Sequence, residues 1–522
     1  MSRLPLGVQT FRDIRLQNQI YVDKTGYVHQ LATGPKYIFL SRPRRFGKSL
    51  LISTLDSYFR GHRELFEGLK IAELETEWRQ HPVIRIDFSN TNYRKDGELD
   101  RSIRSMLANI AREYNAPWTD NSALPLNRLF ADILDHIYTT LGPVVILIDE
   151  YDKPLVNVLD DMTIFWRNQS VLAQLYSVLK GNDTKIRFGM LTGVSQFAKL
   201  NIFSGLNNLL DISLDRNYAN LTGFSGDELT AYFSDYLESF RAQTGLPKDV
   251  FREEFRIMYN GYSWNGQDFL YNPFTVLNAF HFNAFRDHWY RTGVTTFLTQ
   301  LIRHHKIIPE DIAPHETSDL VGQSDDPTRI PLAVLLFQTG YLTIKEYRYE
   351  FGYESYVLDY PNREVRNAFF QNILDEFAFQ SSDPYGAIAR DVRQSLRRGN
   401  ADQLFAALTR LFAGIPARLH LPYEAYYHSM VYLFLRLIGF RVQLEQETSK
   451  GRIDGLLETA ERTFIIEFKF AKKGKPETLS KNAIAQIRER AYFEAHRQSA
   501  RELVLLGVGV VHKALHGRWE VV

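Results

Sequence analysis

Short apolar runs alternate with longer amphipathic stretches along residues 35–215 of the chain. The runs read YIFL, VIRIDF, VVILID and IRFGML, and the stretch LLISTLDSYF after the first run has apolar positions at helical spacing. This alternation is typical of a parallel sheet with crossover helices, and a continuous apolar run suits a strand that is buried on both faces. We therefore predict an α/β domain over residues 1–215.

The pattern changes three times after this domain. Helical spacing in FSGDELTAYFSDYLESF and YNPFTVLNAFHFNAF predicts a small helical or winged-helix-like lid over 216–300. A segment rich in Pro, Asp and His and then an amphipathic stretch indicate a linker and helical middle region over 301–414. A long helix, a hairpin, a second helix and the apolar strand LVLLGVGVV predict a compact α/β domain over 415–522.

Composition excludes several classes of protein. The chain has 522 residues, 44% hydrophobic residues and no cysteine, which predicts several folded domains and excludes disulfides and cysteine-based chemistry. There is no window of about 18 uninterrupted apolar residues and no apolar signal core, so we expect a cytoplasmic protein that does not contact membranes. Because the net charge is only +1, nucleic-acid binding would depend on local basic clusters such as Lys469-Lys472-Lys473-Lys475.

The stretch SRPRRFGKSLL lies between the run YIFL and a helical stretch, which is the order of a phosphate-binding loop. The backbone N–H groups of such a loop bind phosphate oxygens, a lysine reaches the terminal phosphates, and a hydroxyl binds Mg²⁺. Gly47, Lys48 and Ser49 match these three requirements. Arg42 occupies the position where the general pattern has its first glycine.

The run VVILID supplies the acidic partner that such a loop requires. Asp149 lies at its C-terminal end, where ligands bind in open α/β sheets, on a strand that we predict to neighbour the loop strand. Asp149 would hold the metal, and Glu150 would orient or deprotonate the attacking water. Arg44 and Arg45 either contact phosphates or form salt bridges with these carboxylates or with Asp152. The alternative for the loop alone is a basic surface turn.

Together with YVDKTGYV, LIDEYDKPL, LTGVSQFAKLNIFSGLNNL and YNPFTVL, the loop resembles the bacterial and archaeal predicted AAA-ATPase family over roughly the first 280 residues. The arginine pair before the glycine is part of that family's motif. The resemblance implies ATP with Mg²⁺, a RecA-like AAA+ or STAND-type core, and a polar sensor after the fourth core strand, for which Thr192 or Ser195 would serve. Pro273 is similar to the proline that touches adenine in STAND-type lids, or it only breaks a helix.

A second candidate site lies in GRIDGLLETAERTFIIEFKF, residues 451–470, whose two halves can pair as a hairpin. If the loop is Thr459 to Arg462, Glu458 faces Thr463, and counting outward places Asp454 opposite Glu467. Opposed carboxylates destabilise a ladder unless a divalent cation lies between them. The pattern therefore predicts a metal between the two strands.

Mg²⁺ prefers oxygen ligands and keeps several waters, so Asp454, Glu467 and a backbone carbonyl would hold it beside a water and a phosphate oxygen. Lys469 faces the same way and would position the water and stabilise charge on the phosphate. The alternative for Glu-x-Lys alone is a solvent-exposed pair.

The same pattern resembles the PD-(D/E)xK nuclease superfamily over about 415–515, in a small restriction-endonuclease-like α/β domain. The proline of the motif is absent, since Ile453 precedes the aspartate. Ser480 is predicted to be the N-cap of the helix that carries the last motif residue. Carried over residue by residue, the resemblance implies Glu424 as the helical acid, Asp454 as metal ligand, Glu467 and Lys469 as the E-x-K, and Gln486 as the helical polar residue with Tyr492 beside it.

These patterns predict a protein that binds and hydrolyses ATP and thereby controls a Mg²⁺-dependent nuclease, with DNA favoured over RNA as partner. We also expect a homo-oligomer, and the architecture suggests a role in defence against foreign DNA. One alternative is a STAND-like switch, in which ATP drives oligomerisation and the C-terminal domain only binds nucleic acid. Another is a DNA-processing ATPase without cleavage. Because a decayed nuclease would lose one of Asp454, Glu467 and Lys469, the presence of all three favours cleavage.

Overall fold

The computed structural model forms two compact units, which comprise residues 1–301 with 313–366 and residues 302–312 with 367–522. The residues that the structure describes are 3–118, 124–196, 208–289, 314–321, 329–369, 385–413, 427, 430–432, 434–435, 440–448, 451–459, 461–491, 501–511 and 514–522. None of the helices in these ranges has the length and apolar character that a bilayer crossing requires.

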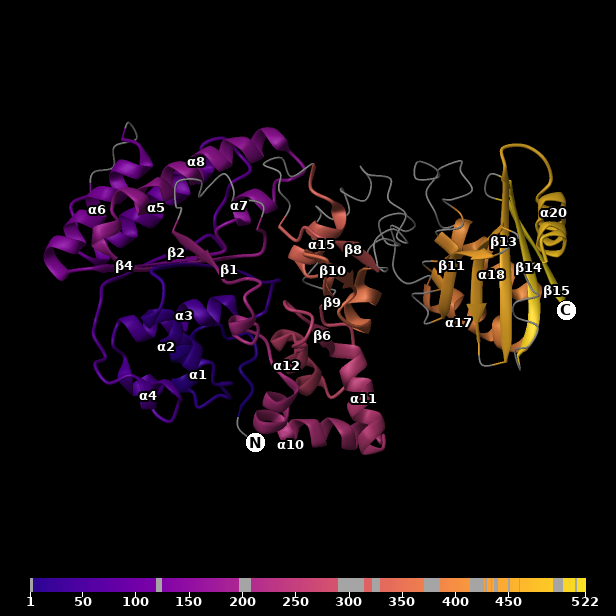
Figure 1. Ribbon diagram of the computed structural model, residues 1–522, viewed down its shortest axis with the longest axis horizontal. Helices are drawn as coiled ribbons and strands as arrows, with labels where there is room; N and C mark the ends of the chain where they lie inside the picture. Colours follow the sequence, from indigo (N-terminus) through magenta and orange to yellow (C-terminus); the bar gives the residue numbers. More distant parts are fainter. Residues whose placement is uncertain are drawn as a thin grey trace. The chain divides into compact units, whose positions relative to one another are not determined.

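The first unit is built around a five-stranded sheet in the order β2-β3-β4-β1-β5, with all pairs parallel (Figure 1). Its strands are β1 (Tyr37–Ser41), β2 (Val83–Asp87), β3 (Val144–Asp149), β4 (Ile186–Gly193) and β5 (Leu209–Asp211). All residues of β1 and β3 are buried, as their apolar runs predict. The predicted parallel α/β sheet is confirmed. However, β4 lies between β1 and β3, so the prediction that the acidic strand neighbours the loop strand is wrong, because chain order alone does not determine strand order.

Helices cover both faces of this sheet (Figure 1). One layer consists of α5 (Glu98–Glu113), α6 (Leu126–Leu141) and α8 (Met162–Gly181), and the other of α1 (Phe11–Leu16), α2 (Thr25–Thr33), α3 (Lys48–Phe59) and α4 (Ile71–Leu74). Each layer closes a separate apolar core against the sheet. Short elements complete this part, namely η1 (Arg63–Phe66), α7 (Lys153–Val156), η2 (Asp183–Lys185) and η3 (Arg216–Tyr218).

The segment after η3 folds as a helical subdomain with its own aromatic core. It contains α10 (Gly226–Thr244), α11 (Lys248–Tyr259), the two-stranded pair β6 (Asn260–Tyr262) and β7 (Leu270–Tyr271), and α12 (Pro273–Phe282). Its core is dominated by phenylalanines, among them Phe233, Phe240, Phe255 and Phe280. Asn272 caps α12 by accepting from the backbone N–H groups of residues 274 and 275, so Pro273 begins a helix.

Residues 314–359 differ from the predicted linker and helical region. Their described part holds α15 (Leu332–Thr339) and an antiparallel sheet of β8 (His315–Thr317), β10 (Tyr353–Asp359) and β9 (Thr343–Glu350), in that order. The single apolar stretch AVLLFQTGYLTI contains both a helix and a strand. Gly340 separates them, because its φ of +88° ends α15 in a left-handed C-cap.

The second unit contains a mixed sheet in the order β11-β12-β13-β14-β15, in which only β13 and β14 are parallel. Its elements are α17 (Tyr385–Arg398), α18 (Ala401–Ala413), β11 (Arg441–Thr448), β12 (Gly451–Glu458), β13 (Arg462–Ala471), α20 (Pro476–Glu489), β14 (Glu502–Val511) and β15 (Ala514–Val521). The Arg462 guanidinium donates to the carbonyls of Leu396 and Arg397 at 3.2 and 2.8 Å. The helices before residue 415 therefore pack with this sheet.

Helix α20 crosses from β13 to the parallel strand β14. Gly507 and Gly509 allow its close approach, because a Cβ atom at these positions would lie 2.5 Å from the Ser480 carbonyl and 2.1 Å from the Pro476 carbonyl. The helix begins at Pro476, with Lys475 as N-cap. The prediction that Ser480 is the N-cap is therefore wrong; its hydroxyl donates to the Glu477 carbonyl within the helix at 3.0 Å.

Candidate nucleotide and nuclease sites

The loop from Arg42 to Gly47 connects β1 to α3. Its left-handed residues are Arg45, with φ +66°, and Gly47, with φ +89°. Gly47 is the N-cap of α3, so Lys48 and Ser49 begin the helix. Glycine is favoured where φ is positive, which explains why the loop requires glycine at its end.

Lys48 is buried behind this loop. Its ammonium donates to the carbonyls of Arg42 and Pro43 at 2.8 and 3.0 Å. Burial lowers the pKa of Lys48, while the carboxylates of Asp149, Glu150 and Asp152 oppose this shift. The loop lysine is therefore near enough to the carboxylates at and just after the end of β3 for their charge to act on it.

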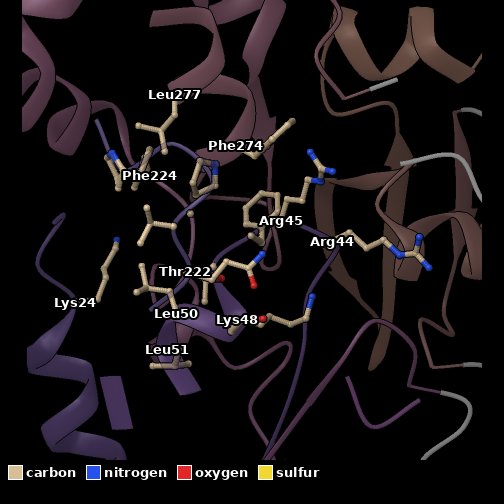
Figure 2. Close-up of a pocket in the computed structure, with 18 of the residues that line it drawn as sticks. Lys24, Arg44, Arg45, Lys48, Leu50, Leu51, Thr222, Phe224, Phe274 and Leu277 are labelled. Atoms are coloured by element: carbon tan, nitrogen blue, oxygen red, sulfur yellow. The ribbon is translucent and has the colours of Figure 1, made fainter. Parts of the chain in front are cut away.

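A cavity of about 560 Å³ opens in front of the loop, within the usual size range of ligand pockets. In Figure 2, Arg44, Arg45 and Lys48 lie on one side of the view, and Lys24, Phe224 and Leu277 lie on the other. The remaining walls include Ser49, Glu150, Asp152, Thr222, Pro273 and Phe274, with Pro5, Val8 and Ile20 from the N-terminal segment. The loop side is cationic, and the other side combines apolar groups with the single cation Lys24 (Figure 2); this suits a nucleotide with its phosphates at the loop and its base against the apolar groups.

Asp149 ends β3 with its side chain fully buried. Its Oδ1 accepts hydrogen bonds from the Thr192 hydroxyl at 2.6 Å and from the Glu150 backbone N–H at 3.1 Å. Its Oδ2 is buried and has no hydrogen-bond partner among the described residues. A buried carboxylate oxygen without a partner is costly, and it fits the requirement of a hard cation such as Mg²⁺ for oxygen ligands.

The second sensor candidate, Ser195, contacts a different carboxylate. The Asp152 side chain accepts from the Ser195 hydroxyl and backbone N–H, both at 2.6 Å, and from the Val194 backbone N–H at 3.1 Å. Burial raises the pKa of Asp152, and these hydrogen bonds oppose the shift. Of the two candidates, Thr192 is therefore the one whose hydroxyl contacts Asp149.

Glu150 lies at the mouth of the site with a left-handed φ of +53°. Its carboxylate forms an ion pair of 2.8 Å with Lys153, whose ammonium also donates to the Ser89 carbonyl at 2.8 Å. Non-glycine residues in this conformation are uncommon and concentrate at functional sites. The backbone thus turns Glu150 into the cavity that Lys48 also lines.

The two loop arginines do not form the salt bridges that the sequence left open. Arg44 donates to the Asn157 side-chain oxygen at 3.1 Å, and the Arg45 guanidinium lies 3.8 Å from the ring centre of Phe274. Neither makes an ion pair with a carboxylate within the described ranges. Both side chains line the cavity, so the alternative in which they contact phosphates remains.

Sequence reasoning assigned no role to Lys24, which also lines the cavity. Its ammonium donates to the Asn220 carbonyl at 2.8 Å and pairs with Glu228 at 2.5 Å, and burial lowers its pKa. Lys24 lies in YVDKTGYV, one of the segments that carry the family resemblance. The sequence therefore marked this segment as part of the family's pattern, although it assigned no role to Lys24 itself.

The C-terminal hairpin has the predicted register. Glu458 pairs with Thr463, and the pairing continues to Gly455 opposite Ile466, so the next residues outward are Asp454 and Glu467. Counting from the loop therefore predicted the two strands correctly.

Four of the predicted nuclease residues gather where β12 and β13 meet α20. Glu467 is 1% exposed, and its Oε1 accepts from the Lys469 ammonium at 3.1 Å and from the Gln486 amide. The Asp454 carboxylate accepts from the backbone N–H of Phe468, next to Glu467, at 2.7 Å. Both carboxylates are thus held in fixed orientations, which a metal ligand requires.

Other predicted members of this site cannot be placed. Glu424 and Tyr492 lie outside the described residues. Within the described ranges, no group of three or more His, Asp or Glu side chains is arranged to hold a metal ion. The described part of the site therefore provides two carboxylates, Asp454 and Glu467.

Comparisons with known proteins match the two parts of the chain that contain these sites. Residues 5–203 match the family described as "Predicted AAA-ATPase", and residues 422–519 match the PD-(D/E)XK nuclease superfamily. A protein of Azotobacter chroococcum mcd 1, described as "Uncharacterized protein in vnfD 5'region", is 34% identical over 518 residues, which cover 97% of this chain and 96% of that protein.

Two solved structures share 12 and 13% sequence identity with the chain. They are the Aeropyrum pernix ORC1 protein in complex with DNA and the Aeropyrum pernix ORC2 protein in ADPNP-ADP complexes. The matches cover 68 and 67% of this chain and 93 and 92% of those chains, with TM-scores of 0.27 and 0.26.

A phosphate-binding loop after β1 and a buried aspartate after β3 define a P-loop ATPase domain. The chain belongs to the predicted AAA-ATPase family and carries a PD-(D/E)XK nuclease superfamily domain at its C-terminus.

Proposed function

We propose that the first unit binds and hydrolyses ATP and that its nucleotide state controls Mg²⁺-dependent DNA cleavage by the C-terminal domain. The observation that carries the nuclease half is the buried Glu467, whose oxygen is contacted by both Lys469 and Gln486. A domain that only binds nucleic acid has no need to bury a carboxylate beside a lysine, because burial of a charge is costly.

The ATPase half rests on the groups around Lys48. The Lys48 ammonium, now bonded to loop carbonyls, would turn to the terminal phosphates, and Asp149 and Ser49 are the residues that would hold Mg²⁺. When bound, this ion neutralises charge that develops on the phosphates. Glu150 accepts a proton from the attacking water, and Thr192 fixes the orientation of Asp149.

At the nuclease site, Asp454 and Glu467 would hold Mg²⁺, and Gln486 orients Glu467. A divalent cation held there would supply an activated water and Lewis-acid stabilisation of the phosphate. Lys469 is 28% exposed in its side chain, so its ammonium can also contact the phosphodiester and stabilise negative charge there.

Charge favours a nucleic-acid substrate for this domain. Residues 422–519 carry 16 Lys and Arg against 11 Asp and Glu, although the net charge of the whole chain is only +1. Lys472, Lys473 and Lys475 are exposed and directly follow the strand of Glu467 and Lys469. Basic groups beside a cleavage site bind the phosphate backbone.

The decisive experiment measures cleavage of plasmid, linear and single-stranded DNA and of RNA, with ATP, ADP or no nucleotide and with Mg²⁺ or EDTA. We expect Mg²⁺-dependent DNA cleavage that changes with nucleotide, is lost in Lys469→Ala, and loses its ATP response in Lys48→Ala. Cleavage of RNA alone would reassign the substrate. Unchanged cleavage in Lys469→Ala would refute the nuclease assignment, and ATP turnover retained in Lys48→Ala would refute the P-loop assignment.

Two further parts of the proposal concern assembly and biology. Homo-oligomerisation is tested by light scattering with and without ATP, and a monomer under both conditions would contradict it. The defence role rests on the domain architecture. It predicts that cells expressing the wild-type chain resist phage infection, whereas cells expressing Lys469→Ala do not.

A further inference from the structure

Arg42 occupies the position of the first P-loop glycine, but its side chain is buried outside the cavity. Its side chain is 1% exposed and does not line the cavity, whereas residues 44–49 do. The backbone has no need of glycine here, because the left-handed residues of the loop are Arg45 and Gly47. An arginine at this position is therefore compatible with a working loop.

The Arg42 guanidinium binds the backbone of three segments. It donates to the carbonyls of Ser41 at 2.9 Å, Ser213 at 2.6 Å and Tyr218 at 3.3 Å. These carbonyls belong to the end of β1, to the loop after β5 and to η3. The planar fork of an arginine suits such simultaneous contacts, which a lysine cannot reproduce.

The same guanidinium connects the loop to the helical subdomain. It lies 4.5 Å from the ring centre of Trp264, which precedes β7. Phe46, at the other end of the loop, packs edge-to-face on Trp264 and Tyr262, with ring centres 5.5 and 4.8 Å apart. Trp264 therefore contacts both ends of the loop, through Arg42 and through Phe46.

Burying the positive charge of Arg42 costs folding free energy, and the contacts of its side chain must offset that cost. Burial lowers the pKa of Arg42 to about 9, although the charge of Asp211 opposes the shift. An apolar side chain of similar volume would fill the space without desolvating a charge. What it would not do is bind three carbonyls and so fix the path of the chain into the loop.

We propose that Arg42 is a positioning residue for nucleotide binding, which fixes the start of the P-loop so that its backbone N–H groups and Lys48 meet the phosphates. The side chain of Arg42 holds its own backbone in place. The Lys48 ammonium bonds to the carbonyls of Arg42 and Pro43, so the backbone that Arg42 fixes is also the backbone that Lys48 contacts before phosphate binds. The inference rests on the proposed ATP binding, and it goes beyond that function because Arg42 does not line the cavity.

The test uses phosphate number as its readout. ATP, ADP and AMP compete with a fluorescent ADP analogue for the full-length wild type, Arg42→Met and Arg42→Gly. The loop contacts the distal phosphates, while the base end is formed by other residues, so we expect ATP and ADP affinities to fall by about tenfold, or about 1.4 kcal/mol, and AMP affinity by less than about twofold. Arg42→Gly restores the general P-loop sequence and still loses affinity if the side chain positions the loop.

Arg15 provides a matched control. Its guanidinium also binds two backbone carbonyls, those of Leu65 and Glu67 at 2.7 and 2.6 Å, but it does not line the cavity. Arg15→Met should lower the melting temperature and leave all three nucleotide affinities unchanged. If Arg42→Met does not fold, Trp264→Leu, which keeps the three carbonyl contacts, should weaken ATP and ADP by about threefold and spare AMP.

Three outcomes separate the possibilities. If the wild type binds no nucleotide, the proposed ATPase function is wrong, and this inference, which rests on it, is wrong with it. If the wild type binds but Arg42→Met and Arg42→Gly bind as tightly, or lose AMP, ADP and ATP affinity equally, Arg42 has only a general stabilising role and the inference is wrong. An unchanged Trp264→Leu overturns it in the same way when the Arg42 variants do not fold.

Discussion

The Thr192 hydroxyl on β4 donates a 2.6 Å hydrogen bond to the Asp149 carboxylate at the end of β3. The two strands are adjacent and parallel, with Ile148 paired to Leu191, so the contact follows directly from the sheet. It occupies Oδ1, while the buried Oδ2 has no hydrogen-bond partner among the described residues. In the proposed ATPase, Thr192 would hold one oxygen of the aspartate while the other is available to a cation.

Substitution of Thr192 tests this role. Thr192→Val removes the hydroxyl with little change in volume, and we expect kcat for ATP to fall by about tenfold while nucleotide affinity is unchanged, because Asp149 loses a charge-assisted hydrogen bond. Thr192→Ser should restore turnover. Ser195→Ala serves as the control, since its hydroxyl binds Asp152. Wild-type turnover in Thr192→Val would show that the hydrogen bond has no part in hydrolysis.

Glu150 is predicted to act on the attacking water. Glu150→Gln keeps the shape of the side chain but cannot accept a proton, so ATP should still bind while turnover falls by at least about 100-fold. Nucleotide binding is measured by fluorescence titration and turnover by phosphate release. Asp160→Asn, which alters a carboxylate paired with Arg94, is the control. Turnover in Glu150→Gln equal to that of the control would exclude this residue as the base.

Gln486 is predicted to orient Glu467 for metal binding. Gln486→Leu removes the amide that donates to Glu467 Oε1, and we expect about tenfold slower DNA cleavage together with a higher Mg²⁺ requirement, since the loss of such a supporting contact typically costs 10- to 100-fold. Arg488→Gln on the same helix breaks an ion pair with Glu520 instead. If both variants show the same Mg²⁺ dependence as the wild type, Gln486 does not act through the metal.

The sequence predicted these contacts to different extents. The pairing of the hairpin from Glu458 with Thr463 out to Gly455 with Ile466 followed from counting residues outward from the loop, because strand pairing has a fixed period. The choice between Thr192 and Ser195 did not, since both are polar residues close to the end of one strand. Only the tertiary arrangement shows that the former contacts Asp149 and the latter contacts Asp152.

Other features depended on long-range packing that no local pattern records. The buried Arg42 reaches carbonyls more than 170 residues away, and the usual preference of arginine for the surface favours the opposite interpretation. The position of β4 between β1 and β3 is likewise a property of sheet topology. The sheet that contains β9 and β10 was missed because the preceding Pro, Asp and His residues indicated a linker.

Glu364 should make the stability of the first unit depend on pH. Burial raises its pKa to about 8, although the backbone N–H groups of His288 and Trp289 at 2.6 and 2.7 Å and the Thr275 side chain oppose the shift, and the charge of Asp287 adds to it. In the unfolded chain the carboxyl titrates near its ordinary value of about 4.3. Between these values the folded state binds more protons than the unfolded state.

The free energy of unfolding should therefore be greatest at low pH for this group and fall by up to about 1.4 kcal/mol per pH unit between about pH 5 and 8. Glu364→Gln keeps an acceptor for the two N–H groups and removes the titration. Urea denaturation at pH 5.5 and 8 should thus show the variant gaining stability relative to the wild type at the higher pH. An identical difference at both pH values would exclude Glu364 as the source.

Exposed lysines after β13 are predicted to bind the phosphate backbone of DNA. Lys472 and Lys473 are exposed beside the strand that carries Glu467 and Lys469, and each phosphate that a protein neutralises contributes about 0.9 to the slope of log affinity against log salt. Lys472→Gln combined with Lys473→Gln should weaken binding equally for unrelated sequences and reduce this slope by up to about 2, measured by fluorescence anisotropy in the Lys469→Ala background with EDTA. Lys95→Gln with Lys248→Gln, which removes two exposed charges of the first unit, should leave the slope unchanged. Equal slopes in the two double variants would place the DNA-binding surface elsewhere.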